Sequence, residues 1–330
     1  MLSNAEPPVV IRPEAHPAYE SLDRLAVVEM RPPTSPSGIV GPFYDLCRRP
    51  GDLPLTRQVA DLLLALTPSG AVLIVTGLVD EARFPRGEID GPIGSAALAR
   101  ALALLGHRVT VAIDAEAATC VRAVFEAACV SDVEIVTPTP ATAHEARDFG
   151  AGFDAAIAVE KLGRNSLGER HLIWGTPVEV GDPFADEYVL GARAAGRVTI
   201  GVGDNGNEIG FGVISDVAEP LAPAGVHCEG GFFAATPVDV LLPASVSNFG
   251  CYAIVAALAL GAARLDLAVA GDEIRRWTQA GLDAGLRSGG VDDPDFQGDD
   301  GVPLTYVRAY ADLLAGVVHQ NLLGDAWLAP

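Results

Sequence analysis

The chain has 330 residues, with 22 Lys and Arg against 43 Asp and Glu, which gives a formal net charge of −21. Hydrophobic residues make up 49% of the sequence and charged residues 20%, so disorder over most of the length is excluded and a sizeable core is expected. The acidic excess argues against a nucleic acid or an anionic membrane as partner, because both require Lys and Arg at the contact. Carboxylates in such numbers usually serve as solvated surface charge, so a functional role for them needs separate support.

Residues 1–38 are rich in proline and polar residues, which predicts an N-terminal arm or irregular lead-in. Residues 39–330 are then expected to form a single domain, because no linker or repeat interrupts them. Residues 163–182 interrupt the alternation of strands and helices and are predicted to be irregular. Strands are predicted at 71–76, 109–113, 133–136, 155–159, 198–202 and 238–242, and helices at 55–66, 95–105, 116–129, 142–149, 186–195, 247–263, 267–286 and 304–322.

Alternation of strands and helices with short connections predicts an α/β fold. The sheet should be mostly parallel with helices on both faces, a three-layer sandwich. The longest apolar run, 249–263, is shorter than the roughly 18 residues of a spanning helix, so no membrane partner is expected. Five scattered cysteines and a start unlike a signal peptide indicate the cytoplasm. A homo-oligomer remains open.

The loop after the first predicted strand is acidic and rich in glycine. Ligands of such folds bind beyond the carboxyl ends of the strands, so this loop is a candidate site. Glu88 and Asp90 are two residues apart and can point to one side of an extended segment. Gly77, Gly87 and Gly91 let the backbone turn and approach a ligand. An ordinary solvated loop explains this segment equally well.

The loop after the fifth predicted strand contains a G-x-G-x-x-G motif at Gly201, Gly203 and Gly206. A dinucleotide fingerprint is the obvious interpretation. However, Asp204 lies where a pyrophosphate would bind, and Glu208 follows one helical turn later, so the two carboxylates would repel that ligand. No nucleotide cofactor is therefore expected. The same two carboxylates suit a hard cation such as Mg²⁺ or Mn²⁺.

Further candidates follow other strands. Glu160 ends a predicted strand and can join the acidic group, and Arg164 is suited to a substrate carboxylate or phosphate, although solvated charge explains both equally well. Ser247 and Asn248 open a long apolar helix, where they can cap the helix or hold an anionic substrate group. The acidic stretch 292–300 is a fourth candidate, although such runs are more often simply solvated.

Taken together, these motifs resemble the D-glutamate cyclase-like family. The resemblance implies a metal-dependent lyase of amino-acid metabolism that converts D-glutamate to 5-oxo-D-proline and water. An Mn²⁺-dependent phosphatase among archaeal relatives implies the alternative, an Mn- or Mg-dependent phosphatase or other hydrolase. Asn205 departs from a glycine usual in the family. The matching segments, in the family's order, are 76–77, 87–94, 160–164, 200–210 and 246–250.

The residues and the resemblance predict one site with a divalent cation, Mn²⁺ or Mg²⁺ (Ca²⁺ could replace it in a crystal), and a small anionic substrate, D-glutamate-like or a phosphate ester. A dinucleotide-binding oxidoreductase and a non-catalytic binding protein remain as other hypotheses. The predicted metal ligands are Glu88, Asp90, Glu160, Asp204 and Glu208, of which all but Glu160 are also predicted to be catalytic. The predicted substrate-binding residues are Arg164, Asn207, Ser247 and Asn248, and the loop-forming residues are Gly77, Gly87, Gly91, Gly201, Gly203 and Gly206.

Overall fold

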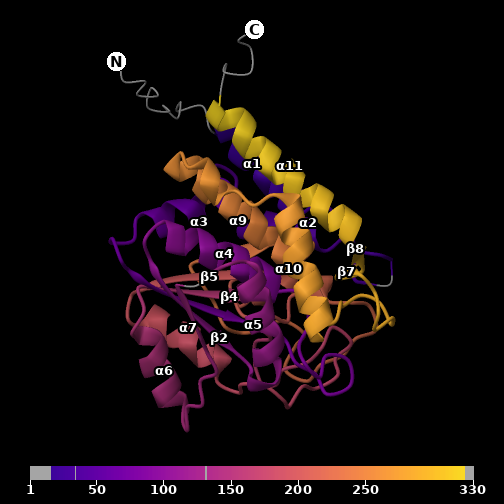
Figure 1. The fold of residues 1–330 in the computed structure, drawn as a ribbon. Coiled ribbons are helices and arrows are strands. Elements are labelled where there is room, and N and C mark those ends of the chain that lie inside the picture. Colours follow the sequence, from indigo (N-terminus) through magenta and orange to yellow (C-terminus); the bar gives the residue numbers. More distant parts are fainter. Residues whose placement is uncertain (1–15, 34, 131, 324–330) are drawn as a thin grey trace, which may run out of the picture.

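The computed structural model describes residues 16–33, 35–130 and 132–323. Its centre is a six-stranded parallel sheet in the order β3-β2-β1-β4-β5-β6 (Figure 1). In the register of this sheet, Ile74 lies between Val111 and Ile157. The strands are β1 (Ala71–Thr76), β2 (Arg108–Ile113), β3 (Val133–Val136), β4 (Ala155–Val159), β5 (Val198–Gly203) and β6 (Val240–Pro243), and a separate antiparallel pair is β7 (Gly298–Asp299) and β8 (Val302–Pro303).

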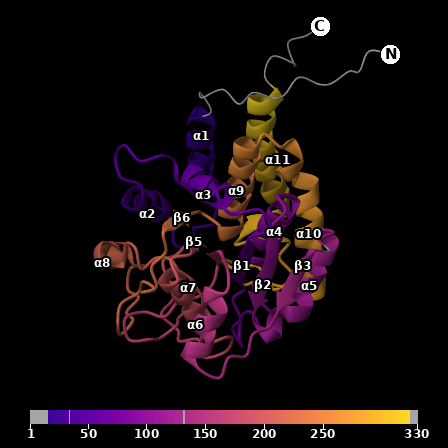
Figure 2. The same cartoon turned by 90° about the vertical axis from the view of Figure 1, so that its left-hand side faces the viewer.

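Helices cover both faces of the sheet, which confirms the predicted three-layer α/β fold (Figure 2). Successive residues of β1 point to opposite faces. Val72 and Ile74 join the larger core with α3, α4 and α9, whereas Leu73 and Val75 join the smaller core with α2, α6 and α7. The helices are α1 (His16–Ala26), α2 (Val40–Cys47), α3 (Leu55–Leu64), α4 (Pro92–Leu104), α5 (Ala118–Ala127), α6 (Ala143–Ala151), α7 (Ala185–Ala194), α8 (Ser215–Ala218), α9 (Ser247–Ala262), α10 (Gly271–Ala284) and α11 (Leu304–Leu323).

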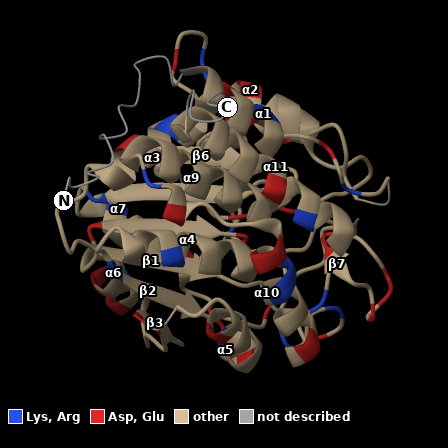
Figure 3. Ribbon diagram, turned by 45° about the horizontal axis from the view of Figure 1, so that its top comes forward, with Lys and Arg blue, Asp and Glu red and all other residues tan. Residues whose placement is uncertain are grey.

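Helix α9 is the centre of the larger core. It carries no charged residue (Figure 3). Every residue from Ser247 to Leu260 is buried. It packs against α1, α3, α4 and α11 as well as the sheet. A helix that is apolar on all sides is typical of such a position. Within the described residues, no helix is long and apolar enough to cross a membrane.

The predicted strands and helices of the domain are all present, and their ends differ from the predictions by a few residues. Two predicted helices are each divided. The one predicted at 116–129 begins as a 3-10 turn, Ala115–Ala117, and the one predicted at 267–286 consists of the turn Leu265–Leu267 followed by α10. Helix α4 starts three residues early, because Pro92 fits the first turn of a helix.

The N-terminal lead-in differs most from its prediction. Residues 16–26, expected to be irregular, form α1, because Ala18, Leu22 and Ala26 make an apolar face that is buried in the larger core. Helices α1 and α11 lie side by side (Figure 1). Residues 1–15 of the lead-in lie outside the described residues.

Candidate active site

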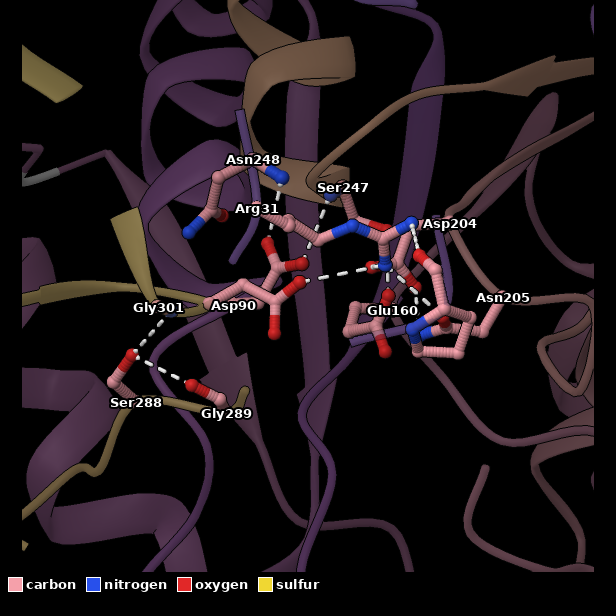
Figure 4. A network of polar contacts seen from close by, with 12 residues as sticks. Arg31, Asp90, Glu160, Asp204, Asn205, Ser247, Asn248, Ser288, Gly289 and Gly301 are labelled. Atoms are coloured by element: carbon pink, nitrogen blue, oxygen red, sulfur yellow. Dashed lines mark hydrogen bonds and ion pairs between the residues drawn. The ribbon is translucent and has the colours of Figure 1, made fainter. Parts of the chain in front are cut away.

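The acidic residues meet at the carboxyl edge of the sheet. Glu160 follows β4, Asp204 follows β5, and Asp90 lies in the connection between β1 and α4 (Figure 4). The strand order reverses direction between β1 and β4, so this edge is the topological switch point at which open α/β sheets bind ligands. The sequence prediction that separate strand ends contribute to one site is consistent with this placement.

Three carboxylates form the candidate metal centre. One oxygen each of Asp90, Glu160 and Asp204 lies within 4.8 Å of the others, and all three side chains are buried. An all-oxygen donor set of this kind fits a hard cation such as Mg²⁺ or Mn²⁺. Within the described residues, these are the His, Cys, Asp and Glu side chains that converge this closely.

The backbone at the site is held in unusual conformations. Glu160 and Asp300 have φ values of +44° and +43°, which non-glycine residues rarely adopt and which tend to occur at functional sites. Gly91 has φ +94°, and a Cβ there would lie 2.7 Å from Thr76 Oγ1 and 2.9 Å from Glu160 Cβ. Glycine at position 91 therefore allows the loop to approach Glu160.

The carboxylate of Asp90 is also bound by the N-terminus of α9. Its carboxylate accepts hydrogen bonds from the backbone N–H groups of Ser247 (2.9 Å) and Asn248 (2.7 Å). The Ser247 hydroxyl donates to Glu160 Oε2 at 2.6 Å, and the Asn248 amide donates to Asp299 Oδ2 at 2.8 Å. The anion at this helix N-terminus is thus a carboxylate of the protein itself. Neither Ser247 nor Asn248 lines the cavity, so the structure does not place them for the predicted contact with substrate.

Glu208 lies in the same acidic group but has a different local structure from the one predicted. Residues 204–208 form no helix, so the expected helical turn between Asp204 and Glu208 is wrong. The Glu208 carboxylate instead accepts hydrogen bonds from the N–H groups of Asn205 (3.2 Å) and Gly206 (2.8 Å). It therefore fixes the loop. Gly201 and Gly203 also lie within β5 instead of in this loop, and a Cβ on Gly203 would come within 2.9 Å of Glu208 Oε2.

A cavity of about 30 Å³ opens onto the three carboxylates, and this volume holds about two water molecules. Glu88 lines it, and within the described residues no hydrogen bond reaches the Glu88 carboxylate. Asn207 lines it as well. The Asn207 amide donates to His171 O at 2.8 Å, while its buried Oδ1 has no partner. The lining residues are Leu78, Phe84, Glu88, Asp90, Glu160, Leu172, Ile173, Trp174, Asp204, Asn205, Asn207, Gly289, Gly290 and Asp300.

Burial raises the pKa of the carboxyl groups in this cluster. The pKa of Asp90 rises to about 7, because burial removes water and Asp300 repels its charge, although backbone N–H groups oppose the shift. Burial and neighbouring carboxylates also raise the pKa of Glu88 and Glu160 well above the ordinary range, and the pKa of Asp204 rises for the same reasons. Like charges packed this closely require compensating protons or cations.

Arg164 is not among the residues that line the cavity, so its predicted contact with substrate stays a prediction. Its guanidinium forms ion pairs with Glu187 and, at 3.3 Å, with Asp186. These carboxylates already neutralise it.

Sequence reasoning left one contributor, Asp300, open and missed another, Arg31. Asp300 lines the cavity and belongs to the acidic stretch that was expected to be mostly solvated. Arg31 reaches the cluster from the segment after α1 and lies 2.6 Å from Asp204. The acidic stretch supplied a signal for Asp300, whereas nothing local marks Arg31 among the other arginines.

Fold and site together define an α/β protein with a buried carboxylate centre at the sheet switch point. The sequence matches the D-glutamate cyclase-like, C-terminal family over residues 48–300. The chain belongs to this family.

The human mitochondrial D-glutamate cyclase is 28% identical over 234 residues, which cover 63% of this chain and 36% of that protein. The chain therefore spans about a third of the length of this curated relative. Among solved structures, a UDP-glucose dehydrogenase from the archaeon Pyrobaculum islandicum overlaps 78% of this chain and 69% of that chain. The overlap has a TM-score of 0.25 and 15% identity, so it carries no argument about fold or function.

Proposed function

We propose that this protein is a metal-dependent lyase that cyclises D-glutamate to 5-oxo-D-proline with loss of water. The observation that carries the proposal is the buried trio Asp90, Glu160 and Asp204, which opens onto a cavity in a member of the D-glutamate cyclase-like family. The unpartnered Oδ1 of Asn207 in the same cavity is a second observation in favour of a ligand site, because buried polar atoms normally have a partner. No observation favours the phosphatase alternative.

The trio would hold the divalent cation, Mn²⁺ or Mg²⁺. Within the described residues, no Lys or Arg lines this cavity, so the carboxylates alone would repel an anionic substrate. The bound ion would supply the positive charge that admits and polarises the γ-carboxylate of D-glutamate. Asn207 Oδ1, which is buried without a partner, would accept a hydrogen bond from the substrate ammonium group or from water.

Glu88 is the best candidate for the general base. It lines the cavity, lies outside the trio, and has a carboxylate free of hydrogen bonds to other described residues. Its pKa is raised, mainly by burial and further by neighbouring carboxylates, which makes it a stronger proton acceptor than an exposed glutamate. It would take a proton from the substrate ammonium and return it to the departing oxygen. The C–N bond then forms, one γ-C–O bond breaks, and two ammonium protons leave with that oxygen as water.

A neighbouring cavity of about 170 Å³ offers a place for the α-carboxylate. It shares Phe84, Gly289 and Gly290 with the acidic cavity and is also lined by Arg83 and Arg287. Arg83 stacks over Trp174 and pairs with an exposed carboxylate at 3.4 Å. Within the described residues, no carboxylate lies within ion-pair distance of Arg287. Arg287 therefore replaces Arg164 as the candidate for binding the substrate α-carboxylate.

The test is to incubate the purified protein with D-glutamate and to measure 5-oxoproline by NMR, with Mn²⁺, with Mg²⁺ and with a chelator. Product that forms only with a divalent cation, and that disappears in Glu88→Gln, supports the proposal. L-glutamate and p-nitrophenyl phosphate serve as comparison substrates. Turnover of the phosphate ester without cyclisation of D-glutamate would instead establish the hydrolase alternative.

A further inference from the structure

Arg31 is a buried cation inside the acidic cluster. Its side chain is fully buried, and it belongs to the segment between α1 and α2, outside the residues 48–300 that match the family. Figure 4 shows its guanidinium lying among the carboxylates. A buried arginine is stable only when its charge is compensated. Its partners therefore show what it does in the site.

The guanidinium joins two carboxylates from distant parts of the chain. Its Nη1 donates to Asp204 Oδ2 at 2.6 Å and lies 3.5 Å from Asp300 Oδ2. The same nitrogen donates to Asn205 Oδ1 at 3.0 Å, and the Asn205 amide donates to Asp204 Oδ1 at 2.5 Å. Nη2 donates to Pro36 O at 3.0 Å, which holds the guanidinium in place from its own segment.

Charge and position both make Arg31 equivalent to a bound cation. Within the described residues, Arg31 is the one basic side chain that forms an ion pair with a carboxylate of the cluster. The seven buried carboxylates of the cluster are Glu88, Asp90, Glu160, Asp204, Glu208, Asp299 and Asp300. Arg31 does not line the cavity, whereas Asp204 and Asp300 do. Asp204 therefore belongs both to the trio and to the pair of carboxylates that Arg31 joins.

Two-metal sites place their ions roughly 3.5–4 Å apart and share carboxylates between them. Here Asp204 is the carboxylate that two ions could share, but its Oδ2 already accepts a hydrogen bond from the Arg31 guanidinium. We propose that Arg31 occupies the position of a second divalent cation, so that the site binds one metal ion per chain. Arg31 is thus a positioning residue that orients Asp204. This inference rests on the proposed metal centre.

The test is the stoichiometry of Mn²⁺ binding to the full chain, measured by calorimetry and by the loss of the EPR signal of free Mn²⁺. Wild type and Arg31→Lys, which keeps the charge, are expected to bind one ion. Arg31→Met removes the charge but keeps an unbranched stem, and it is expected to bind two. Millimolar guanidinium chloride should return Arg31→Met to one ion, a rescue that a merely structural role would not give.

Arg31→Gln is the second neutral variant and keeps a polar N–H donor group on a shorter side chain. It gives the same comparison if Arg31→Met does not fold, as judged by melting in chelator. Two ions on the wild type, or one ion on both the wild type and a folded neutral variant, would overturn the role of Arg31 and leave the metal centre standing. No ion on the wild type would overturn the metal centre itself, and the inference with it.

Discussion

At the scale of single residues, the carboxylates of this site differ in what already holds them. Asp90 is bound by the N-terminus of α9 and Glu208 by the backbone of its own loop. Glu88 has no such partner within the described residues and faces the cavity. Carboxylates with several N–H partners are fixed in orientation, whereas Glu88 is left for proton transfer.

The metal centre predicts a residue-specific response to Mn²⁺. Wild type should melt at a higher temperature when Mn²⁺ is added, because an ion that binds only the folded state stabilises it. Asp204→Asn should lose most of this increase, since it removes a ligand charge from the trio. Asp295→Asn, the same chemical change at an exposed position near the site, should keep it. An equal response in all three proteins would mean that the ion binds elsewhere.

The raised pKa of Asp90 predicts how stability depends on pH without metal. The folded protein holds this proton up to about pH 7, whereas the ordinary pKa is 3.8. Between these values the folded state binds more protons than the unfolded state, so stability falls as pH rises through this window. The Tm in chelator should therefore decrease from about pH 4 to pH 7. Mn²⁺ should offset the decrease near pH 7, and a Tm that rises across the window in chelator would contradict this.

Arg287 predicts a separation of substrate binding from metal binding. Arg287→Met should raise the KM for D-glutamate at least tenfold, because a hydrogen bond to a charged group contributes about 1.5–3 kcal/mol. Its Mn²⁺ affinity should stay unchanged, since Arg287 does not line the acidic cavity. Arg197→Met, at an exposed arginine that directly precedes β5 and pairs with Asp154 at 3.1 Å, is the control on another part of the surface. An unchanged KM would exclude Arg287 from substrate binding.

At the scale of elements, the crossing of α4 and α9 connects the core to the site. A Cβ on Gly94 of α4 would lie 2.7 Å from Cys251 Cβ and 2.9 Å from Asn248 Cα on α9. Asn248 Oδ1 accepts hydrogen bonds from the N–H groups of Gly91 (3.0 Å) and Gly94 (2.5 Å), so this crossing also holds the Asp90 loop. Close packing of these two helices therefore positions a member of the trio.

Alanine at two helix crossings should separate stability from metal binding. Gly94→Ala and Gly150→Ala, the latter between α6 and α7, each force a Cβ into backbone atoms. Each should lower the free energy of unfolding by about 1–3 kcal/mol or more, as measured with urea in chelator. Only Gly94→Ala should also weaken Mn²⁺ binding, because only that crossing holds Asp90. Equal losses of Mn²⁺ affinity would disprove the coupling.

At the scale of the whole molecule, the segment before the family-matched region is part of both core and site. Asp23 of α1 accepts hydrogen bonds from the N–H groups of Leu55 (2.7 Å) and Thr56 (3.0 Å) and from the Tyr44 hydroxyl (2.6 Å). It thereby caps α3 from another helix. Arg31 follows a few residues later in the acidic cluster. The segment before the family-matched region therefore joins the fold at Asp23 and at Arg31.

Removing the Asp23 cap should destabilise the whole protein. Asp23→Ala leaves buried N–H groups of α3 without partners, which should lower the free energy of unfolding by about 1–3 kcal/mol. Asp23→Asn keeps one acceptor oxygen and should lose less. Both variants are measured by urea unfolding, with Asp61→Ala on the exposed face of α3 as control. If Asp23→Ala unfolded like the control, α1 would not be part of the cooperative unit.

The sequence predicted the sheet and most of the helices because their signals are local. The run Ala71–Thr76 is buried along its whole length, and its composition alone indicated a buried strand. The candidate carboxylates could be found in the same way, since they directly follow strands. The roles of Arg164 and Ser247 could not, because each depends on which distant group lies opposite.

The sequence by itself determined the α/β class, the parallel sheet and the carboxylates at its edge, since these follow from the order and periodicity of neighbouring residues. The tertiary structure decided how those carboxylates are used. Arg31 and Asp204 are 173 positions apart, and no local pattern connects them. Packing of α1 against the core brings the arginine to the acidic cluster. A buried charge is stable only beside an opposite charge, and which residues become neighbours depends on the tertiary structure.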